Sequence, residues 1–351
     1  MTKLNQNLAL DLTESGLLPD RIIRHGIRRL LRQRLQEVHA DNLERMADDQ
    51  HEFIQLMQQA EIAPIPHKAN EQHYEVPAEF YLRTLGPNLK YSCCYWPAGV
   101  STLAEAEKAG LETTCKHAGL VDGMRILELG CGWGSLSLWM ARHYPNSHIT
   151  AVSNSHSQRE FILQHARQAG LQNLEVITCD MNDFDTDEQF DRIVSVEMFE
   201  HMRNYQKLFH RISNWLLPDG EFFMHIFVHR DTPYAFVDNG PSDWMSRHFF
   251  SGGMMPSDDL PLHFQDYLKL QQHWRWSGTH YEKTANAWLA KMDEFKEQLW
   301  PTFEKTYGRD FAQKWWMRWR MFFMACAELF GYDDGQQWFV SHYRFSKRTD
   351  Q

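Results

Sequence analysis

Two carboxylates and an imidazole follow residue 196 within a span of five residues. Glu197, Glu200 and His201 come directly after the apolar segment 190–196, which we expect to be a buried strand. A helix that begins here would place the three side chains on one face. Such groups can accept a proton from a nucleophile or stabilise a developing cation. The alternative is the capped start of a helix whose acids are solvated.

A glycine-rich turn is the second feature with chemical meaning. The apolar run at 124–129 predicts a buried strand, Gly130, Gly132 and Gly134 follow at alternate positions, and residues 135–142 have helical spacing. Strand, glycine turn and helix form the opening of a nucleotide-binding βαβ unit. Glycine belongs there because a Cβ would hold the backbone away from a ligand. A tight turn that binds nothing is the alternative.

Composition limits the class of protein. The 351 residues carry a formal net charge of −10, with 43% hydrophobic and 13% aromatic residues, which is enough for one large α/β domain with additions or for two small domains. The negative charge argues against nucleic acid as a general partner. No apolar run approaches the roughly 20 residues of a membrane span, and the N-terminus lacks the apolar core of a signal peptide. The six cysteines show neither zinc nor disulfide spacing, so we expect reduced thiols in a cytoplasmic protein and no metal site.

Strands and helices alternate through the middle of the chain. Beside 124–129 and 190–196, we expect strands at 148–152, 174–180 and 220–227, which together predict a doubly wound parallel sheet. Ligands bind such sheets at the carboxyl ends of the strands. Asn154 and Gln158 follow the second strand and can hydrogen-bond a ribose. Asp180 ends the third strand, where a carboxylate could accept the adenine amino proton.

The remaining segments are expected to surround this sheet. Residues 1–70 predict an N-terminal helical segment that ends in a linker at 64–66. Within it, residues 20–38 form a basic amphipathic helix with six arginines, which could lie on an anionic membrane, dock a partner or pack on the protein's own core. Residues 71–351 would form the main domain. Its stretch 229–335 has many tryptophans and mostly helical spacing, and could be a substrate lid or a second packing layer. Residues 338–345 alternate again and should close the sheet as its last strand.

The aromatic segment 74–96 precedes the glycine turn and could cover a cofactor or be a packed loop. From this segment to Lys347 the chain resembles coclaurine N-methyltransferases and their relatives in the cyclopropane-fatty-acyl-phospholipid synthase family. The resemblance rests on residues 91–96, Glu128 with the three glycines of the turn, 153–158, 197–202, 225–226, 278–281 with Trp288, and 331–332. It implies a Rossmann-like class I methyltransferase that uses S-adenosylmethionine.

The family pattern implies positions for the functional residues. Cofactor contacts would come from Tyr91, Ser92, Glu128, Gly130, Gly132, Gly134, Asn154, Gln158, Asp180 and Val196. In the N-methyltransferase branch the catalytic cluster corresponds to Glu197, Glu200 and His201, and Cys326 stands where the family has an active cysteine. The lipid branch instead has glycine at position 197 and holds a bicarbonate ion with groups that correspond to Cys93, Glu200, His225 and Tyr281.

The sequence thus combines two signatures. Glu197 favours methyl transfer to a small, largely apolar amine, with Glu200 and His201 deprotonating or orienting the nitrogen and Glu197 stabilising the ammonium product. Cys93 and Tyr281 leave open the alternative, in which an unsaturated phospholipid acyl chain is methylated and bicarbonate takes the proton. A protein that binds S-adenosylmethionine or lipid without turnover is a third hypothesis. A homodimer is possible.

Overall fold

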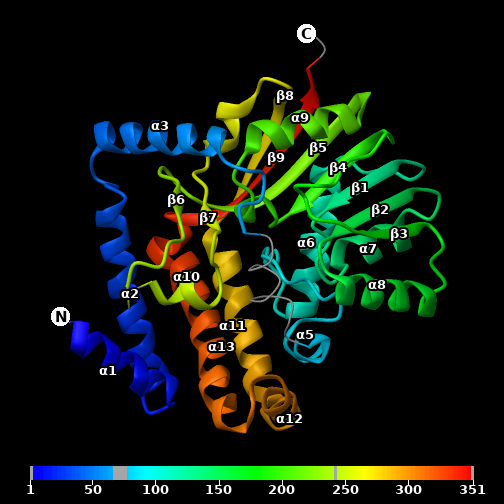
Figure 1. Cartoon of the computed structure of the whole chain (residues 1–351). Coiled ribbons are helices and arrows are strands. Elements are labelled where there is room, and N and C mark those ends of the chain that lie inside the picture. Colours follow the sequence, from blue (N-terminus) through cyan, green and yellow to red (C-terminus); the bar gives the residue numbers. More distant parts are fainter. Residues whose placement is uncertain (1–2, 66–76, 241–242, 349–351) are drawn as a thin grey trace.

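The computed structural model describes residues 3–65, 77–240 and 243–348 (Figure 1). In this part of the chain, seven strands form one mixed sheet in the order β3-β2-β1-β4-β5-β9-β8. The strands are β1 (Arg125–Leu129), β2 (His148–Ser153), β3 (Leu174–Thr178), β4 (Phe190–Val196), β5 (Leu216–His229), β8 (Leu268–Trp276) and β9 (Trp338–Lys347). Strands β1 to β5 pair in parallel, whereas β9 runs antiparallel to both of its neighbours. The predicted doubly wound, Rossmann-like fold is confirmed.

Helices cover both faces of the parallel strands, which explains why β1 is mostly apolar and is buried from Ile126 to Leu129. Ile126 of β1 packs in a cluster with α6 (Leu103–His117) and α7 (Ser135–His143). Leu127 points the other way, into a cluster with α9 (Tyr205–Trp215). The helix α8 (His156–Gln168) packs against β3. The carboxyl ends of the strands therefore lie at one rigid edge, where a ligand site can form.

The helix α6 begins with a capping box and also holds a loop of the site. The side chain of Thr102 accepts the N–H of Glu105, and the Glu105 carboxylate accepts the N–H of Thr102. Two residues further on, the fully buried carboxylate of Glu107 accepts three backbone N–H groups, from Gly86 at 2.9 Å, Asn88 at 2.7 Å and Lys90 at 3.1 Å. One side chain thereby fixes the loop that leads into residues 89–92.

A helical layer continues from the sheet and forms the lower part of the molecule in Figure 1. It consists of α5 (Ala78–Thr84), α11 (Gly278–Glu294), α12 (Lys296–Tyr307) and α13 (Arg309–Phe330). Shorter elements are β6 (Tyr234–Ala235), β7 (Met254–Met255), α10 (Trp244–His248) and the 3-10 turns Phe199–His201, Leu260–Phe264 and Tyr332–Gly335.

The strand β8 was not expected from the sequence. Residues 229–335 are mostly helical and residues 338–345 lie in the last strand of the chain, as we expected, but β8 lies within the first range and forms the sheet edge beyond β9. The pairing of β8 with β9 is irregular between Leu270 and Gln272. This irregularity breaks the period of two, and the strand is half exposed, so apolar alternation could not reveal it.

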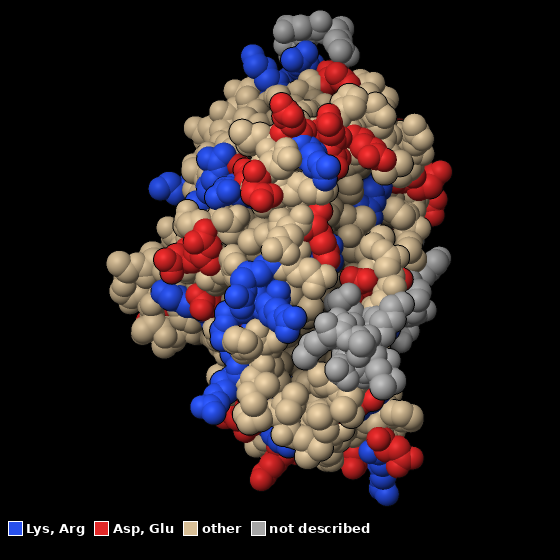
Figure 2. Space-filling view, turned by 90° about the vertical axis from the view of Figure 1, so that its left-hand side faces the viewer, with Lys and Arg blue, Asp and Glu red and all other residues tan. Residues whose placement is uncertain are grey.

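The N-terminal helices are α1 (Lys3–Glu14), α2 (Asp20–Glu37) and α3 (Leu43–Gln59). The basic helix α2 packs along α13: Ile23 is buried, Arg24 pairs with Glu328 at 3.0 Å, and Asp20 pairs with Arg320 at 2.8 Å. Packing on the protein's own core therefore accounts for part of its apolar side, whereas Ile22 and Leu30 are exposed. Figure 2 shows the face on which these helices lie, with a band of basic side chains among acidic ones. Among the described residues, no helix is long and apolar enough to cross a bilayer.

The end of α3 is fastened to the main sheet domain. The backbone of Ala63 exchanges two hydrogen bonds with the side-chain amide of Asn182, both at 2.9 Å, and Asn204 donates to the carbonyl of Ala60 at 2.9 Å. The predicted linker continues to Pro66, and the aromatic segment was expected to begin at Tyr74. Both of these residues, and the boundary expected between 70 and 71, lie outside the described residues.

Candidate active site

The glycine turn between β1 and α7 uses its three glycines in two ways. All three have positive φ, at +78°, +52° and +81° for Gly130, Gly132 and Gly134. A Cβ on Gly130 would lie 2.8 Å from Met198, and one on Gly134 would lie 2.6 Å from Ile162, so these two permit close packing within the protein. A Cβ on Gly132 would meet no protein atom within 4 Å. The backbone at Gly132 is thus open toward a cavity.

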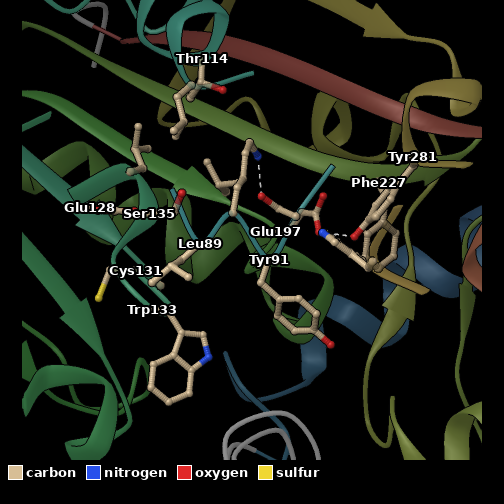
Figure 3. A pocket seen from close by; sticks show the side chains of 18 of the residues that line it. Leu89, Tyr91, Thr114, Glu128, Cys131, Trp133, Ser135, Glu197, Phe227 and Tyr281 are labelled. Carbon is tan, nitrogen blue, oxygen red and sulfur yellow. Dashed lines mark hydrogen bonds between the residues drawn. The ribbon is translucent and has the colours of Figure 1, made fainter. Parts of the chain in front are cut away.

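Two adjoining cavities, of about 980 Å³ and about 750 Å³, meet at this turn. Figure 3 shows the first, with Glu197 between the side of Tyr281 and Phe227 and the side of the glycine turn. The second extends past the ends of β2 and β3. Gly130, Gly132, Glu197 and His201 line both cavities, so one continuous site runs from the strand ends to the helical layer.

The predicted cofactor residues divide between these two cavities. Tyr91, Ser92, Glu128, Gly130, Gly132 and Val196 line the first, and Gly130, Gly132, Asn154, Gln158 and Asp180 line the second. Gly134 is the exception, because it is packed against Ile162 behind the turn. The Glu128 carboxylate accepts a hydrogen bond from Ser137, yet burial raises the pKa of Glu128 to about 7.

Three buried polar atoms on the cavity walls have no hydrogen-bond partner among the described residues. They are Nε1 of Trp133, Oγ of Ser135 and Nε2 of Gln158. The other amide atom of Gln158, Oε1, is already satisfied by Ser153 at 2.6 Å. Buried polar groups are normally paired, so these atoms point to a polar ligand. Together with the open backbone at Gly132, they fit a molecule such as S-adenosylmethionine, which has an amino acid end, hydroxyls and a base.

Glu197 holds the central position in the first cavity. It follows β4 with φ of +50°, a left-handed conformation that is uncommon for a residue with a side chain. Oε1 accepts the N–H of Cys93 at 2.9 Å and lies 3.2 Å from Nε2 of His225, while Oε2 accepts the hydroxyl of Tyr281 at 2.7 Å. Burial raises the pKa of Glu197, but the hydrogen bond with His225, the charge of Lys90 and the N–H of Cys93 outweigh it, so the pKa lies below its ordinary value. The residue is a carboxylate.

We expected Glu197, Glu200 and His201 to lie on one face of a helix, but they do not. Glu197 precedes the short 3-10 turn Phe199–His201, and no α-helix begins there. The carboxyl of Glu200 is fully buried, accepts the N–H of Phe227 at 2.8 Å, and is not among the groups that line either cavity. Burial and the charge of Glu197 raise the pKa of Glu200 well above its ordinary value. Glu200 is therefore a neutral acid behind the cavity wall.

His201 does reach the cavity. It lines both parts of the site, and its ring stacks on Phe250 with centroids 4.7 Å apart. Burial lowers the pKa of His201 to about 4, against the opposing effect of Glu197. The imidazole is neutral at physiological pH and can accept a proton.

The groups that the resemblance assigned to bicarbonate surround Glu197 instead. The Cys93 N–H, the His225 ring and the Tyr281 hydroxyl all engage its two oxygens. Neither Cys93 nor His225 is among the residues that line the cavities. A bicarbonate ion would need the same donors, so the site as built does not accommodate one.

All six cysteines are free thiols, and Cys326 is the one for which the resemblance implied a catalytic role. It lies on α13 and lines the first cavity. Burial, and then the charge of Glu197, raise its pKa to about 12. A thiol of this kind is a poor nucleophile, so the catalytic role expected for Cys326 is not favoured.

Several residues of the site were not found from the sequence. An aromatic wall of the first cavity comes from distant segments: Trp133, Phe227, Phe250, Trp288 and Phe322. Trp288 lies seven residues after Tyr281 on α11, a spacing that could have signalled one shared face. Nothing in the sequence marked Lys90 and Glu107 as residues that shape the site, because isolated charged side chains are usually solvated.

Comparisons with known proteins agree with this geometry. Residues 65–338 match the family model described as mycolic acid cyclopropane synthetase. The (S)-coclaurine N-methyltransferase of Thalictrum flavum subsp. glaucum is 38% identical over 339 residues, which cover 95% of this chain and 94% of that protein. The cyclopropane-fatty-acyl-phospholipid synthase of Escherichia coli (strain K12) is 30% identical over 273 residues, covering 77% of this chain and 66% of that protein.

A solved structure gives the same result. The crystal structure of coclaurine N-methyltransferase bound to N-methylheliamine and SAH superimposes with a TM-score of 0.93 at 36% identity, over 97% of this chain and 99% of that one. Fold and glycine turn thus define a class I methyltransferase that depends on S-adenosylmethionine. The chain belongs to the mycolic acid cyclopropane synthetase family.

Proposed function

We propose that this methyltransferase transfers the methyl group of S-adenosylmethionine to the nitrogen of a small, largely apolar amine. The observation that carries the proposal is the position of the Glu197 carboxylate. It uses the N–H of Cys93, the ring of His225 and the hydroxyl of Tyr281, which are the groups that would otherwise hold bicarbonate. The chain thus replaces an exchangeable base with a fixed negative charge.

A fixed carboxylate beside an aromatic wall suits an amine. Phe227, Phe250 and Trp288 give the first cavity apolar surface, and aromatic faces attract cations. Glu197 would stabilise the positive charge that develops on nitrogen as the new bond forms. A carbocation on an acyl chain would instead have to lose a proton, and a fixed carboxylate already saturated with donors is a poor base.

The roles of the chain's own residues follow from their places. The cofactor, when bound, supplies an activated methyl group, so orientation of the nitrogen provides most of the acceleration. His201 is neutral and lines the cavity, and we assign to it the orientation of the amine nitrogen, because a group with so low a pKa is a weak base. Glu200 is protonated and buried, so we assign to it the positioning of this turn through the N–H of Phe227.

The test is product analysis with isotope-labelled S-adenosylmethionine. Coclaurine, heliamine and simple aliphatic secondary amines would be offered in parallel with vesicles of unsaturated phospholipid. Mass spectrometry should find the labelled methyl group on an amine and leave the acyl chains unchanged. Labelled cyclopropane in the vesicle lipids, with no amine product, would overturn the proposal in favour of the lipid reaction.

We also propose a cytoplasmic location, because six free thiols, four of them buried, suit a reducing compartment. The homodimer expected from the sequence stays a prediction, and sedimentation velocity would check it.

A further inference from the structure

Three histidine side chains form a column that leads from Glu197 to the outside of the sheet. Nε2 of His225 lies 3.2 Å from Glu197, Nδ1 of His225 lies 2.8 Å from Nε2 of His342, and Nδ1 of His342 lies 2.8 Å from Nδ1 of His117. His225 and His342 are fully buried on the paired strands β5 and β9. His117, the last residue of α6, is partly exposed.

One protonation pattern of this column satisfies the charge of Glu197 and all three hydrogen bonds together. A carboxylate only accepts, so Nε2 of His225 must carry the proton that it donates to Glu197. A neutral imidazole has one N–H, so Nδ1 of His225 accepts and Nε2 of His342 donates to it. Nδ1 of His342 must then accept, and Nδ1 of His117 donates. All three hydrogen bonds therefore point inward, toward the carboxylate.

Aromatic rings hold the column in place. The ring of His117 stacks on Trp274 with centroids 4.1 Å apart and 4° between planes, Trp276 packs against both His225 and His342, and Phe223 meets His342 edge-on. These rings come from β8 and β5, so the alignment depends on the sheet edge.

We propose that His342 and His117 are positioning residues that fix the tautomer of His225 and thereby keep its Nε2–H directed at Glu197. The inference rests on the proposed function, because it concerns how the carboxylate that meets the amine is kept ionised and oriented. A histidine at a catalytic or metal site is held in one tautomer in the same way, by a hydrogen bond to its other ring nitrogen.

Other charged groups also face the column, and they set its response to pH. Lys116 and Arg344 act on His117, Lys90 acts on His225 and His342, and His273 acts on His342. Burial, with the charges of Lys116 and Arg344, lowers the pKa of His117 to about 4. The column is neutral across the physiological range, and protonation of His117 at low pH would leave its inward hydrogen bond intact.

The test combines nitrogen NMR of ¹⁵N-histidine-labelled protein with kinetics, using His342→Leu, His342→Gln and His117→Ala. In the unsubstituted protein, His225 should show a protonated Nε2 and a bare Nδ1 between about pH 6 and 8. His342→Leu should give mixed tautomers of His225, a fall in kcat of about tenfold or more, and an acidic limb of the pH profile moved upward. The amide of His342→Gln can donate to His225 and accept from His117, so it should restore both readouts.

Tyr343→Phe provides the matched control. It removes one buried hydrogen bond, from the Tyr343 hydroxyl to the carbonyl of Asp258 at 2.7 Å, at the next position of the same strand. It should lose stability but keep the tautomer of His225 and the pH profile. If His342→Leu does not fold, His117→Ala decides, because loss of its donor should mix the tautomers of His342.

Two results would overturn the inference. One is a folded His342→Leu variant that keeps a single His225 tautomer and the original pH profile. The other is a His117→Ala variant with unchanged signals from His342. A wild-type protein that methylates no amine would instead refute the proposed function, while the NMR readout would still decide the role of the column.

Discussion

The hydroxyl of Tyr281 donates a 2.7 Å hydrogen bond to Oε2 of Glu197 and thereby joins α11 to the end of β4. The Tyr281 ring is stacked on Phe330 of α13, with centroids 4.3 Å apart. The orientation of the central carboxylate thus depends on two helices that belong to the segment expected to be a lid. The helical layer takes part in the electrostatics of the site as well as in its shape.

Tyr281→Phe should change the pH dependence of turnover. Glu197 has a lowered pKa and acts as a carboxylate, so activity should be present above that pKa and lost as the pH falls through it. Removal of the phenolic donor takes away about 1.5 kcal/mol of stabilisation of the charged form, which corresponds to roughly one pH unit. The acidic limb of kcat against pH should move upward by that amount. Tyr343→Phe serves as the control, and an unmoved limb in Tyr281→Phe would show that this bond does not set the charge of Glu197.

Gly132→Val should abolish binding of S-adenosylmethionine. The new side chain would enter the open space above the turn rather than displace protein atoms. Isothermal calorimetry should therefore detect no heat of binding. The positive φ adds a strain of about 1–2 kcal/mol, and Gly170→Val matches that strain, because Gly170 has φ of +69° and nothing within 4 Å of its Cβ. Wild-type affinity in Gly132→Val would refute the placement of the cofactor.

Glu200→Gln and Glu200→Ala should differ. If Glu200 is a buried neutral acid, glutamine reproduces its acceptor for the N–H of Phe227 and should keep turnover within about threefold. Alanine leaves that N–H without a partner, which costs about 1–3 kcal/mol, and opens space behind the turn.

His201→Ala should lower kcat by about 10² while affinity for the cofactor stays. A similar loss in Glu200→Gln would contradict the positioning role given to Glu200 and would show that its carboxyl group acts in the reaction.

Glu107→Ala should weaken cofactor binding without touching the cofactor. Three backbone N–H groups lose their shared acceptor, and each can cost about 1 kcal/mol or more when it stays buried. The loop before Leu89 should loosen, with a lower midpoint of thermal unfolding and weaker binding in calorimetry. The control is Glu112→Ala on the same helix, because Glu112 is exposed and forms an ion pair with Lys108 at 3.9 Å. Equal effects of the two substitutions would contradict the role given to Glu107.

The sequence predicted the parallel strands well because each is a short apolar run bounded by turn residues. The strand Phe190–Val196 was expected with the bounds that the structure has. An apolar run and the turn residues that bound it are adjacent in the sequence, so such a strand can be predicted from the sequence alone. The strand β8 carried no such signal, because its pairing irregularity removes the alternation.

The site was predictable as a set of residues but not as an arrangement. Glu197, His201 and Tyr281 were predicted as site residues. Glu197, however, has a left-handed backbone conformation, so it does not lie on a helical face with His201 as we expected. The pKa values of two neighbouring acids also differ. That of Glu197 is lowered, so Glu197 is ionised, whereas burial raises that of Glu200, so Glu200 is neutral. Such differences arise from contacts between distant segments, which one sequence without its fold does not contain.

The two hydrogen bonds between Ala63 and Asn182 link the stability of the N-terminal segment to cofactor binding. Ala63 and Ile65 line the second cavity together with Asp180, so a cofactor there is bound jointly by the N-terminal segment and the sheet. By linkage, a ligand at a hundredfold excess over its Kd adds about 2.7 kcal/mol to the docked arrangement. Amide exchange at residues 58–65 should slow accordingly when S-adenosylmethionine is added. When the cofactor is scarce, the end of α3 and residues 60–65 would undock more often, and a protease would cleave this segment more readily.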